Sequence, residues 1–87
     1  MGQRYNWPMH AHLQQPAIGT DTPRFLRLTL AADLFGGWEL LRESGRAGGR
    51  SQLRRELYLK EADARAAFAK ARDAELHRGF ELASHGE

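Results

Sequence analysis

Cysteine is absent from the 87-residue chain, and long apolar runs are absent as well. Without cysteine there can be no disulfide, no thiolate metal ligand and no cysteine nucleophile, and a reducing cytoplasm is the favoured compartment. No apolar run approaches the roughly 18 residues of a membrane helix. Residues 2–16 are polar and contain two prolines, so they lack the apolar core of a secretory signal. We therefore expect a cytoplasmic protein with no membrane partner.

Lysine is scarce too, because two of the 13 basic residues are lysine and the other 11 are arginine. Arginine carries a planar fork of hydrogen-bond donors that suits phosphate or carboxylate groups. The same bias accompanies GC-rich genomes. The net charge is only +2, so the total charge does not identify the partner.

A chain of this length allows one small domain. All three prolines precede residue 24, in a stretch with little apolar periodicity. We expect residues 1–23 to form a flexible N-terminal arm, with room for one docked segment at 5–7. The folded domain is expected to span residues 24–83, and residues 84–87 to form a disordered tail.

Three strands are predicted in succession after the arm. Leucines at 26, 28 and 30 alternate with Arg27 and Thr29, which is typical of a half-buried strand over 24–31. Residues 38–46 and 52–60 are the second and third strands, and the glycine-containing segments 33–37 and 48–51 are the turns. Short connections favour an antiparallel meander.

The pattern becomes helical at Glu61. Residues 61–78 contain seven alanines, and Ala64, Phe68 and Ala71 recur at helical spacing. Lys60 is a poor N-cap, whereas Gly79 is well suited to end the helix. Residues 80–82 can then form a short edge strand or a packed tail. The expected fold is α+β, a small antiparallel sheet whose leucine face is covered by one helix.

The second strand carries the residues that suggest a function. Arg42, Ser44 and Arg46 share one parity and therefore one face, and Arg54 on the third strand lies opposite its own leucines. If all the leucines pack under the helix, these side chains gather with Arg27 on the open face or its rim.

Two glycines adjoin this strand. Gly48 and Gly49 offer bare amides to an anion, so the region predicts contacts with nucleic-acid phosphates. The alternative is a solvated charged face in which Glu56 offsets the arginines, with an ordinary hairpin turn at the glycines. Trp38 is interpreted as packing rather than as a platform for a ligand.

Residues 24–80 are similar to the WGR domain, a module of poly(ADP-ribose) polymerases and of small stand-alone bacterial proteins. The matching positions lie in order along the chain: Asp33-Leu34-Phe35-Gly36-Gly37-Trp38, Arg42, Gly45-Arg46, Gly48, Gln52, Ala64, Phe68 and Gly79-Phe80. The resemblance implies a small antiparallel sheet with one helix across it. It also implies binding to DNA near a strand break. In the polymerases the motif Trp packs against the sugar of a terminal nucleotide, and the motif Arg reaches the phosphate backbone.

By this resemblance, Arg46 matches the arginine that contacts phosphate, and Gly45 matches the glycine that lets the backbone approach the DNA closely. Arg42 and Arg54 are the expected flanking cations, and Gly48 and Gly49 are expected to contribute backbone amides. Ser44 departs from the family, because the name-giving Trp belongs at that position. Aromatic stacking is worth roughly 1–3 kcal/mol. Its loss lowers affinity about ten- to a hundredfold if nothing compensates. A serine still offers one hydrogen bond to a phosphate oxygen, so contact with the DNA backbone is expected to survive better than recognition of strand ends.

Three other interpretations are open. His10 and His12, with His77 or His85, could bind a metal, although a His-x-His pair is usually incidental. Ser44 lacks a neighbouring histidine, and no nucleotide-binding fingerprint is present, so neither an enzyme, a cofactor nor a small-molecule substrate is expected. The principal rival is a protein-protein adaptor using Trp7, Tyr58 and Phe80. DNA is the expected partner, with a protein partner as the alternative.

Overall fold

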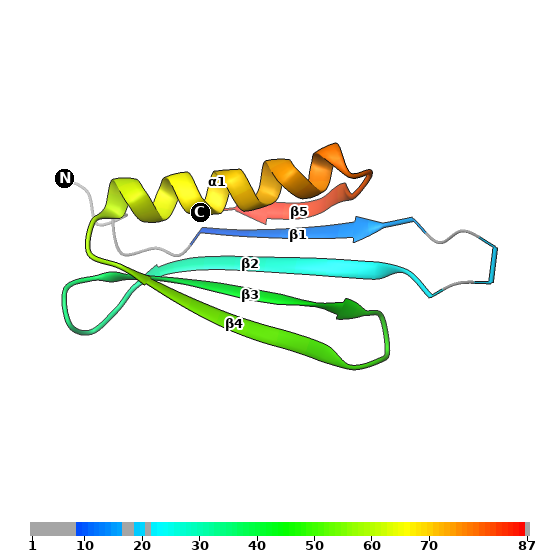
Figure 1. The fold of residues 1–87 in the computed structure, drawn as a ribbon, viewed down its shortest axis with the longest axis horizontal. Coiled ribbons are helices and arrows are strands. Elements are labelled where there is room, and N and C mark those ends of the chain that lie inside the picture. Colours follow the sequence, from blue (N-terminus) through cyan, green and yellow to red (C-terminus); the bar gives the residue numbers. More distant parts are fainter. Residues whose placement is uncertain (1–8, 17–18, 21, 87) are drawn as a thin grey trace.

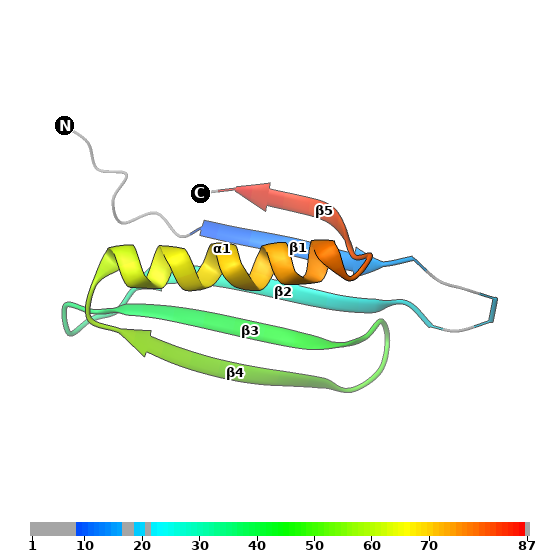
Figure 2. The ribbon, with the colours of Figure 1, turned by 45° about the horizontal axis from the view of Figure 1, so that its top comes forward.

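A computed structural model describes residues 9–16, 19–20 and 22–86. Its elements are β1 (Met9–Gln15), β2 (Arg24–Ala32), β3 (Trp38–Arg46), β4 (Ser51–Tyr58), α1 (Glu61–His77) and β5 (Glu81–Gly86). The strands form one antiparallel sheet in the order β4-β3-β2-β1-β5, and α1 lies across one face of it (Figures 1 and 2). The predicted α+β fold, an antiparallel meander covered by one helix, is confirmed.

The core lies between α1 and the three inner strands. Its buried side chains are Ala11, Leu13, Leu26, Leu28, Leu30, Leu40, Ala64, Phe68 and Ala71. Strand residues of one parity share a face, so the alternating leucines of β2 all reach the helix. No residue of β4 is fully buried in this core, although Tyr58 at the end of β4 packs against it. The side of the sheet that carries α1 is called the helix face below, and the other side is called the open face.

The helix begins and ends as its sequence indicates. Lys60 provides no side-chain cap, while Glu61 and Asp63 lie in the first turn, where the helix dipole favours acidic groups. At the other end, Gly79 has a φ of 99° and the Phe80 N–H donates to the Glu75 carbonyl at 3.0 Å. A left-handed glycine of this kind turns the chain back on itself. It directs β5 to the far edge of the sheet.

The expected arm over residues 1–23 is wrong for Met9–Gln15, which form the strand between β2 and β5. Ala11 and Leu13 are buried against α1, whereas His10 and His12 occupy the opposite parity. This period of two is visible in the sequence, but it is short and Pro16, which follows it directly, favours a loop. Residues 1–8, including the docked segment proposed at 5–7, lie outside the described residues.

The expected disordered tail is wrong in the same way. Residues 84–86 belong to β5, which pairs with β1 from His10 to Gln14. The predicted edge strand is confirmed, but its bounds differ: residues 80–82 were expected, and β5 runs from Glu81 to Gly86. Backbone pairing with β1 forms this strand, although the periodicity of its side chains gives little indication of a strand.

Candidate nucleic-acid interface

The β3–β4 hairpin holds the arginines that the sequence singled out. Gly45 is required here, because a Cβ atom would lie against the Arg50 carbonyl oxygen and 2.8 Å from the Ser51 Cα. The close neighbour of Gly45 is thus its own hairpin partner rather than a ligand. The turn itself uses Gly48, whose φ of 75° suits glycine.

Arg42, Ser44 and Arg46 do share one parity, but that parity is the one of buried Leu40. They therefore lie on the helix face, and the expected placement of Arg42, Ser44, Arg46 and Arg54 on the open face or its rim is wrong. Arg54 lies on the same face because cross-strand partners share a face and Arg54 pairs with Arg42, whereas Leu53 pairs with Glu43 and not with a core residue.

Leu53 and Leu57 are each 66% exposed on the open face. The leucines of β4 thus do not continue the leucine face of β2. Arg54 lies on the helix face instead, because its cross-strand partner is Arg42.

An open groove of about 1140 Å³ lies on the helix face where β2 begins, β3 ends, β4 begins and α1 terminates. Arginines dominate its walls: Arg24, Arg42, Arg46, Arg50, Arg54 and Arg78. Of the predicted site residues, the groove gathers Arg42, Ser44, Gly45, Arg46, Gly49 and Arg54 but does not include Gly48. Glu75 is the single acidic residue among those that line it. We call this feature the arginine groove.

Like charges face each other in the arginine groove. Arg24 of β2 is the cross-strand partner of Arg46 of β3, and Arg42 of β3 is the partner of Arg54 of β4. Directly opposed like charges destabilise a sheet by some tenths of a kcal/mol to about 1 kcal/mol. Two such pairs on one face are difficult to explain by stability alone. An anion bound between them would convert the repulsion into attraction.

Carboxylates neutralise only part of this charge. Glu56 lies 3.5 Å from the Arg42 Nε and 3.7 Å from an Arg54 nitrogen, and Glu75 lies 3.6 Å from Arg78. The Arg42 Nε is buried and makes no hydrogen bond within the described part of the chain. Glu56 therefore offsets one charge of the Arg42–Arg54 pair and leaves the other.

Arg46 is exposed, and its one described side-chain hydrogen bond is a long contact of 3.4 Å to the Thr22 carbonyl. Among residues 9–16, 19–20 and 22–86, no carboxylate lies within 4.0 Å of Arg24, Arg46 or Arg50. An exposed guanidinium with this little internal pairing keeps most of its donors for a ligand.

Ser44 is half-buried between Leu26 of β2 and Gln52 of β4, in the centre of the arginine groove. Trp38, the tryptophan within the described residues, does not replace the missing family side chain, since it lies at the far end of β3 and packs against the core. Phe25 and Phe80 both line the groove, but Phe25 packs against the His12 ring and the Arg27 guanidinium, and Phe80 packs against the core. The groove therefore offers cations and hydrogen-bond donors without a free aromatic platform among its described residues.

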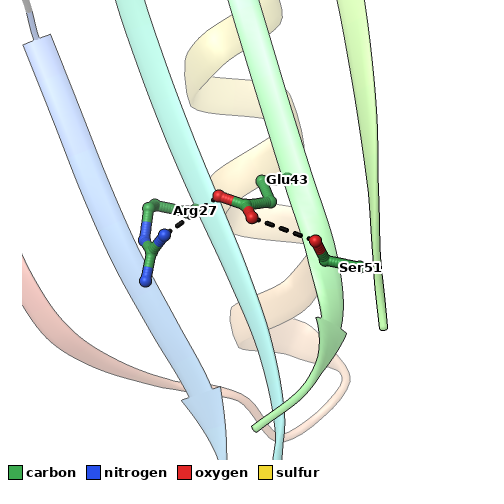
Figure 3. A network of polar contacts seen from close by, with 3 residues as sticks. All are labelled: Arg27, Glu43 and Ser51. Carbon is green, nitrogen blue, oxygen red and sulfur yellow. Dashed lines mark hydrogen bonds and ion pairs between the residues drawn. The ribbon is translucent and has the colours of Figure 1, made fainter. Parts of the chain in front are cut away.

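The open face is different, because its charges are paired. Arg27 donates to Glu43 at 2.9 Å, and the Ser51 hydroxyl donates to the other oxygen of the same carboxylate at 3.0 Å (Figure 3). Arg55 pairs with Glu39 at 2.7 Å. The Arg27 guanidinium also lies 5.3 Å from the centre of the Phe25 ring. Unbalanced positive charge thus collects on the helix face.

The structure differs from the predicted site in two respects. The Gly49 amide donates to the Arg46 carbonyl at 2.9 Å, so it closes the hairpin and is not a free donor for an anion. Arg24, Arg50 and Arg78 were missed. Parity with Leu26 could have placed Arg24 on this face, whereas the position of Arg78 depends on where α1 crosses the sheet.

Within the described residues, no group of three His, Cys, Asp or Glu side chains is arranged to hold a metal ion. His10 and His12 share one parity on β1, and the His12 ring packs edge-on against Phe25 with centroids 6.3 Å apart. No helix among the described residues is long and apolar enough to cross a membrane.

Comparison with known proteins agrees with the fold and with the motif order. The sequence model of the WGR domain matches residues 9–87, which includes β1 as well as the segment that carries the motifs. No curated protein and no solved structure matches the chain. The match covers nearly the whole sequence, and the chain therefore belongs to the WGR domain family.

Proposed function

We propose that this protein binds the phosphate backbone of nucleic acid, DNA in the first instance, in the arginine groove and without reading base sequence. The WGR domain is generally a nucleic-acid-binding module and is not catalytic by itself. The observation that supports the site is the pair of opposed arginine contacts, Arg24 with Arg46 and Arg42 with Arg54. Guanidinium groups fixed on strands lose little conformational freedom when a phosphate binds between them.

The surroundings of each residue give it a different role in phosphate binding. Arg46 is the central phosphate ligand, because it is exposed and has one weak internal contact. Arg42 and Arg54 flank it as cations partly neutralised by Glu56. Ser44 donates a hydrogen bond from the middle of the groove. Without the family tryptophan, backbone contacts contribute more than recognition of a strand end or break.

The test is a titration of the full chain with duplex DNA at several salt concentrations. Counterion release predicts that log affinity falls with log salt at a slope of about −3, for roughly three phosphates. Arg46→Ala is expected to weaken binding and to make the slope shallower by about 0.9. Arg27→Ala is the matched control, because Arg27 is exposed on the open face and paired with Glu43. Affinity that ignores salt, or equal effects of the two variants, would contradict the proposal.

A protein-protein adaptor is the second candidate, and one feature favours it. Leu34 and Phe35 are 95% and 94% exposed at the β2–β3 turn, at the opposite end of the sheet from the arginine groove (Figure 1). The turn holds both side chains in exposed positions, because Asp33 Oδ1 accepts hydrogen bonds from the Phe35 and Gly37 amides at 2.7 and 3.0 Å. A rigid apolar tip of this kind is typical of a contact with another protein.

The adaptor surface predicted from the sequence does not lie there. Tyr58 and Phe80 pack against the core, and Trp7 lies outside the described residues. If the adaptor function holds in place of DNA binding, Arg46→Ala leaves DNA retention unchanged, while the double variant Leu34→Ser, Phe35→Ser abolishes recovery of one defined partner.

A further inference from the structure

Strand β4 forms one edge of the sheet, and no strand of the described residues pairs with its outer backbone groups. The Ala47 N–H donates to the Pro23 carbonyl, so odd-numbered residues of β3 bond to β2. Antiparallel ladders alternate, which directs the even-numbered residues of β3 and their partners in β4 toward each other. The odd-numbered residues of β4 therefore direct N–H and C=O groups outward: Ser51, Leu53, Arg55 and Leu57.

The same strand exposes apolar side chains beside this free edge. Leu53 and Leu57 are each 66% exposed on the open face, with Arg55 between them. The strand contains no proline and no lysine, two residues that commonly block pairing at an edge. An unpaired edge with two exposed leucines is a surface suited to accept another strand.

We propose that two copies of this chain associate through antiparallel pairing of their β4 strands, with the two Arg55 residues facing each other at the symmetry axis. In this register Arg54 of each copy faces Glu56 of the other, and Leu53 faces Leu57. Shifting the register by two residues in one direction opposes the two Arg54 residues, and shifting it in the other opposes the two Glu56 residues. The proposed register is the one among these three that matches opposite charges and joins leucine to leucine.

The one like-charge pair in this register is balanced on each copy. Arg55 lies 2.7 Å from Glu39 of its own chain. Each of the two facing guanidinium groups is therefore neutralised by a carboxylate of the same copy. A symmetric contact of this kind closes after two copies. The symmetry axis runs perpendicular to the sheet, which places both helices and both arginine grooves on one face. The dimer does not depend on the proposed nucleic-acid function.

An interface of one eight-residue strand per copy lies at the low end of specific interfaces, which span roughly 1,200–2,000 Å². We expect a dissociation constant on the order of 10–100 μM. Sedimentation velocity of the full chain should show a mass rising from 9.8 kDa toward twice that value as concentration increases across this range. Leu57→Lys should weaken the dimer at least about tenfold, because it removes both leucine pairs. Leu59→Lys is the control, since Leu59 is 91% exposed just beyond the strand. A chain that stays monomeric throughout, or equal effects of both variants, would overturn the proposal.

Charge exchange tests the register itself. Arg54→Glu alone places two acidic pairs across the interface, and Glu56→Arg alone places two basic pairs, so each variant is expected to be monomeric. An equimolar mixture restores opposite charges at both positions and should dimerise as the parent does. Circular dichroism confirms that both variants are folded. Dimerisation of either variant alone, or none in the mixture, would exclude this register.

Cross-linking provides a second readout that does not depend on charge repulsion. The chain has no cysteine, so Arg54→Cys and Glu56→Cys each introduce a single thiol. Facing residues that do not share ladder hydrogen bonds lie about 4.5 Å apart at Cα, within disulfide reach. Oxidation of the mixture should yield a covalent heterodimer much faster than oxidation of either variant alone. Equal rates in all three samples would contradict the proposed pairing.

Discussion

Arg42 of β3 and Arg54 of β4 face each other across the ladder, and one carboxylate, that of Glu56, lies 3.5 Å from the first and 3.7 Å from the second. Two cations therefore share one counter-charge on a surface that is open to solvent. The arrangement contributes little to folding, because exposed ion pairs of this length contribute about 0–1 kcal/mol. It does hold two guanidinium groups ready for an incoming anion.

Arg54→Gln separates these two effects. We expect the free energy of unfolding to change by less than about 0.5 kcal/mol, because the variant loses a weak ion pair and also a like-charge neighbour. The slope of log affinity for DNA against log salt should become shallower by about 0.9. Arg55→Gln, on the same strand but paired with Glu39 on the open face, should leave that slope unchanged. Urea unfolding and salt titration of both variants decide the question.

Gly45 and Gly49 provide a test of the hairpin geometry. Gly45→Ala would drive a methyl group against the Arg50 carbonyl and the Ser51 Cα, and we expect it to cost about 1–3 kcal/mol. Gly49→Ala is the matched control, because its Cβ would lie 3.6 Å from the nearest atom, an ordinary contact. Urea denaturation should show a loss for the first variant and a change within about 0.5 kcal/mol for the second. Equal stability of the two variants would contradict the assigned role of Gly45.

The sequence predicted the fold correctly because its strands and helix follow simple periods. The leucines of β2 and the pair Phe68 and Ala71 of α1 needed no tertiary information. The faces of β4 were assigned incorrectly because they depend on its register with β3, which pairs Leu53 with Glu43 and Leu57 with Glu39 on the open face. The arginine groove was predicted in part. Arg24 and Arg78 are far apart in sequence and meet only where α1 ends above β2 and β3.

Ser44→Trp restores the family side chain in the centre of the groove. We expect affinity for linear duplex DNA to rise about ten- to a hundredfold, because stacking of an aromatic contributes roughly 1–3 kcal/mol. Affinity for a closed circular duplex should rise much less, since it offers no terminal nucleotide. Fluorescence titration of the parent and the variant with both DNA forms provides the comparison. An equal gain on both forms would show that the tryptophan acts without end recognition.

Tyr58 predicts a dependence on alkaline pH. Burial raises the pKa of Tyr58 above its usual 10.0, and its hydrogen bond to Glu56 acts in the same direction. The folded state therefore keeps the phenolic proton to higher pH than the unfolded state. This contribution to stability is complete below about pH 10 and decreases as the pH rises through the folded-state pKa.

The comparison variant is Tyr58→Phe, which has no phenolic proton. The stability difference between the parent and Tyr58→Phe should narrow between about pH 8 and about pH 11, as measured by urea unfolding. A difference that stays constant or widens over this range would show that the pKa of Tyr58 is not raised in the folded protein.

The most direct test of the arginine groove is an NMR titration of the full chain with duplex DNA at low salt, following the side-chain Nε–H signals of the arginines. The predicted result is that the signals of Arg24, Arg42, Arg46 and Arg50 shift together and saturably, while those of Arg27 and Arg72, which are paired with carboxylates elsewhere on the surface, do not. Shifts spread evenly over all arginines, or confined to the open face, would contradict the account.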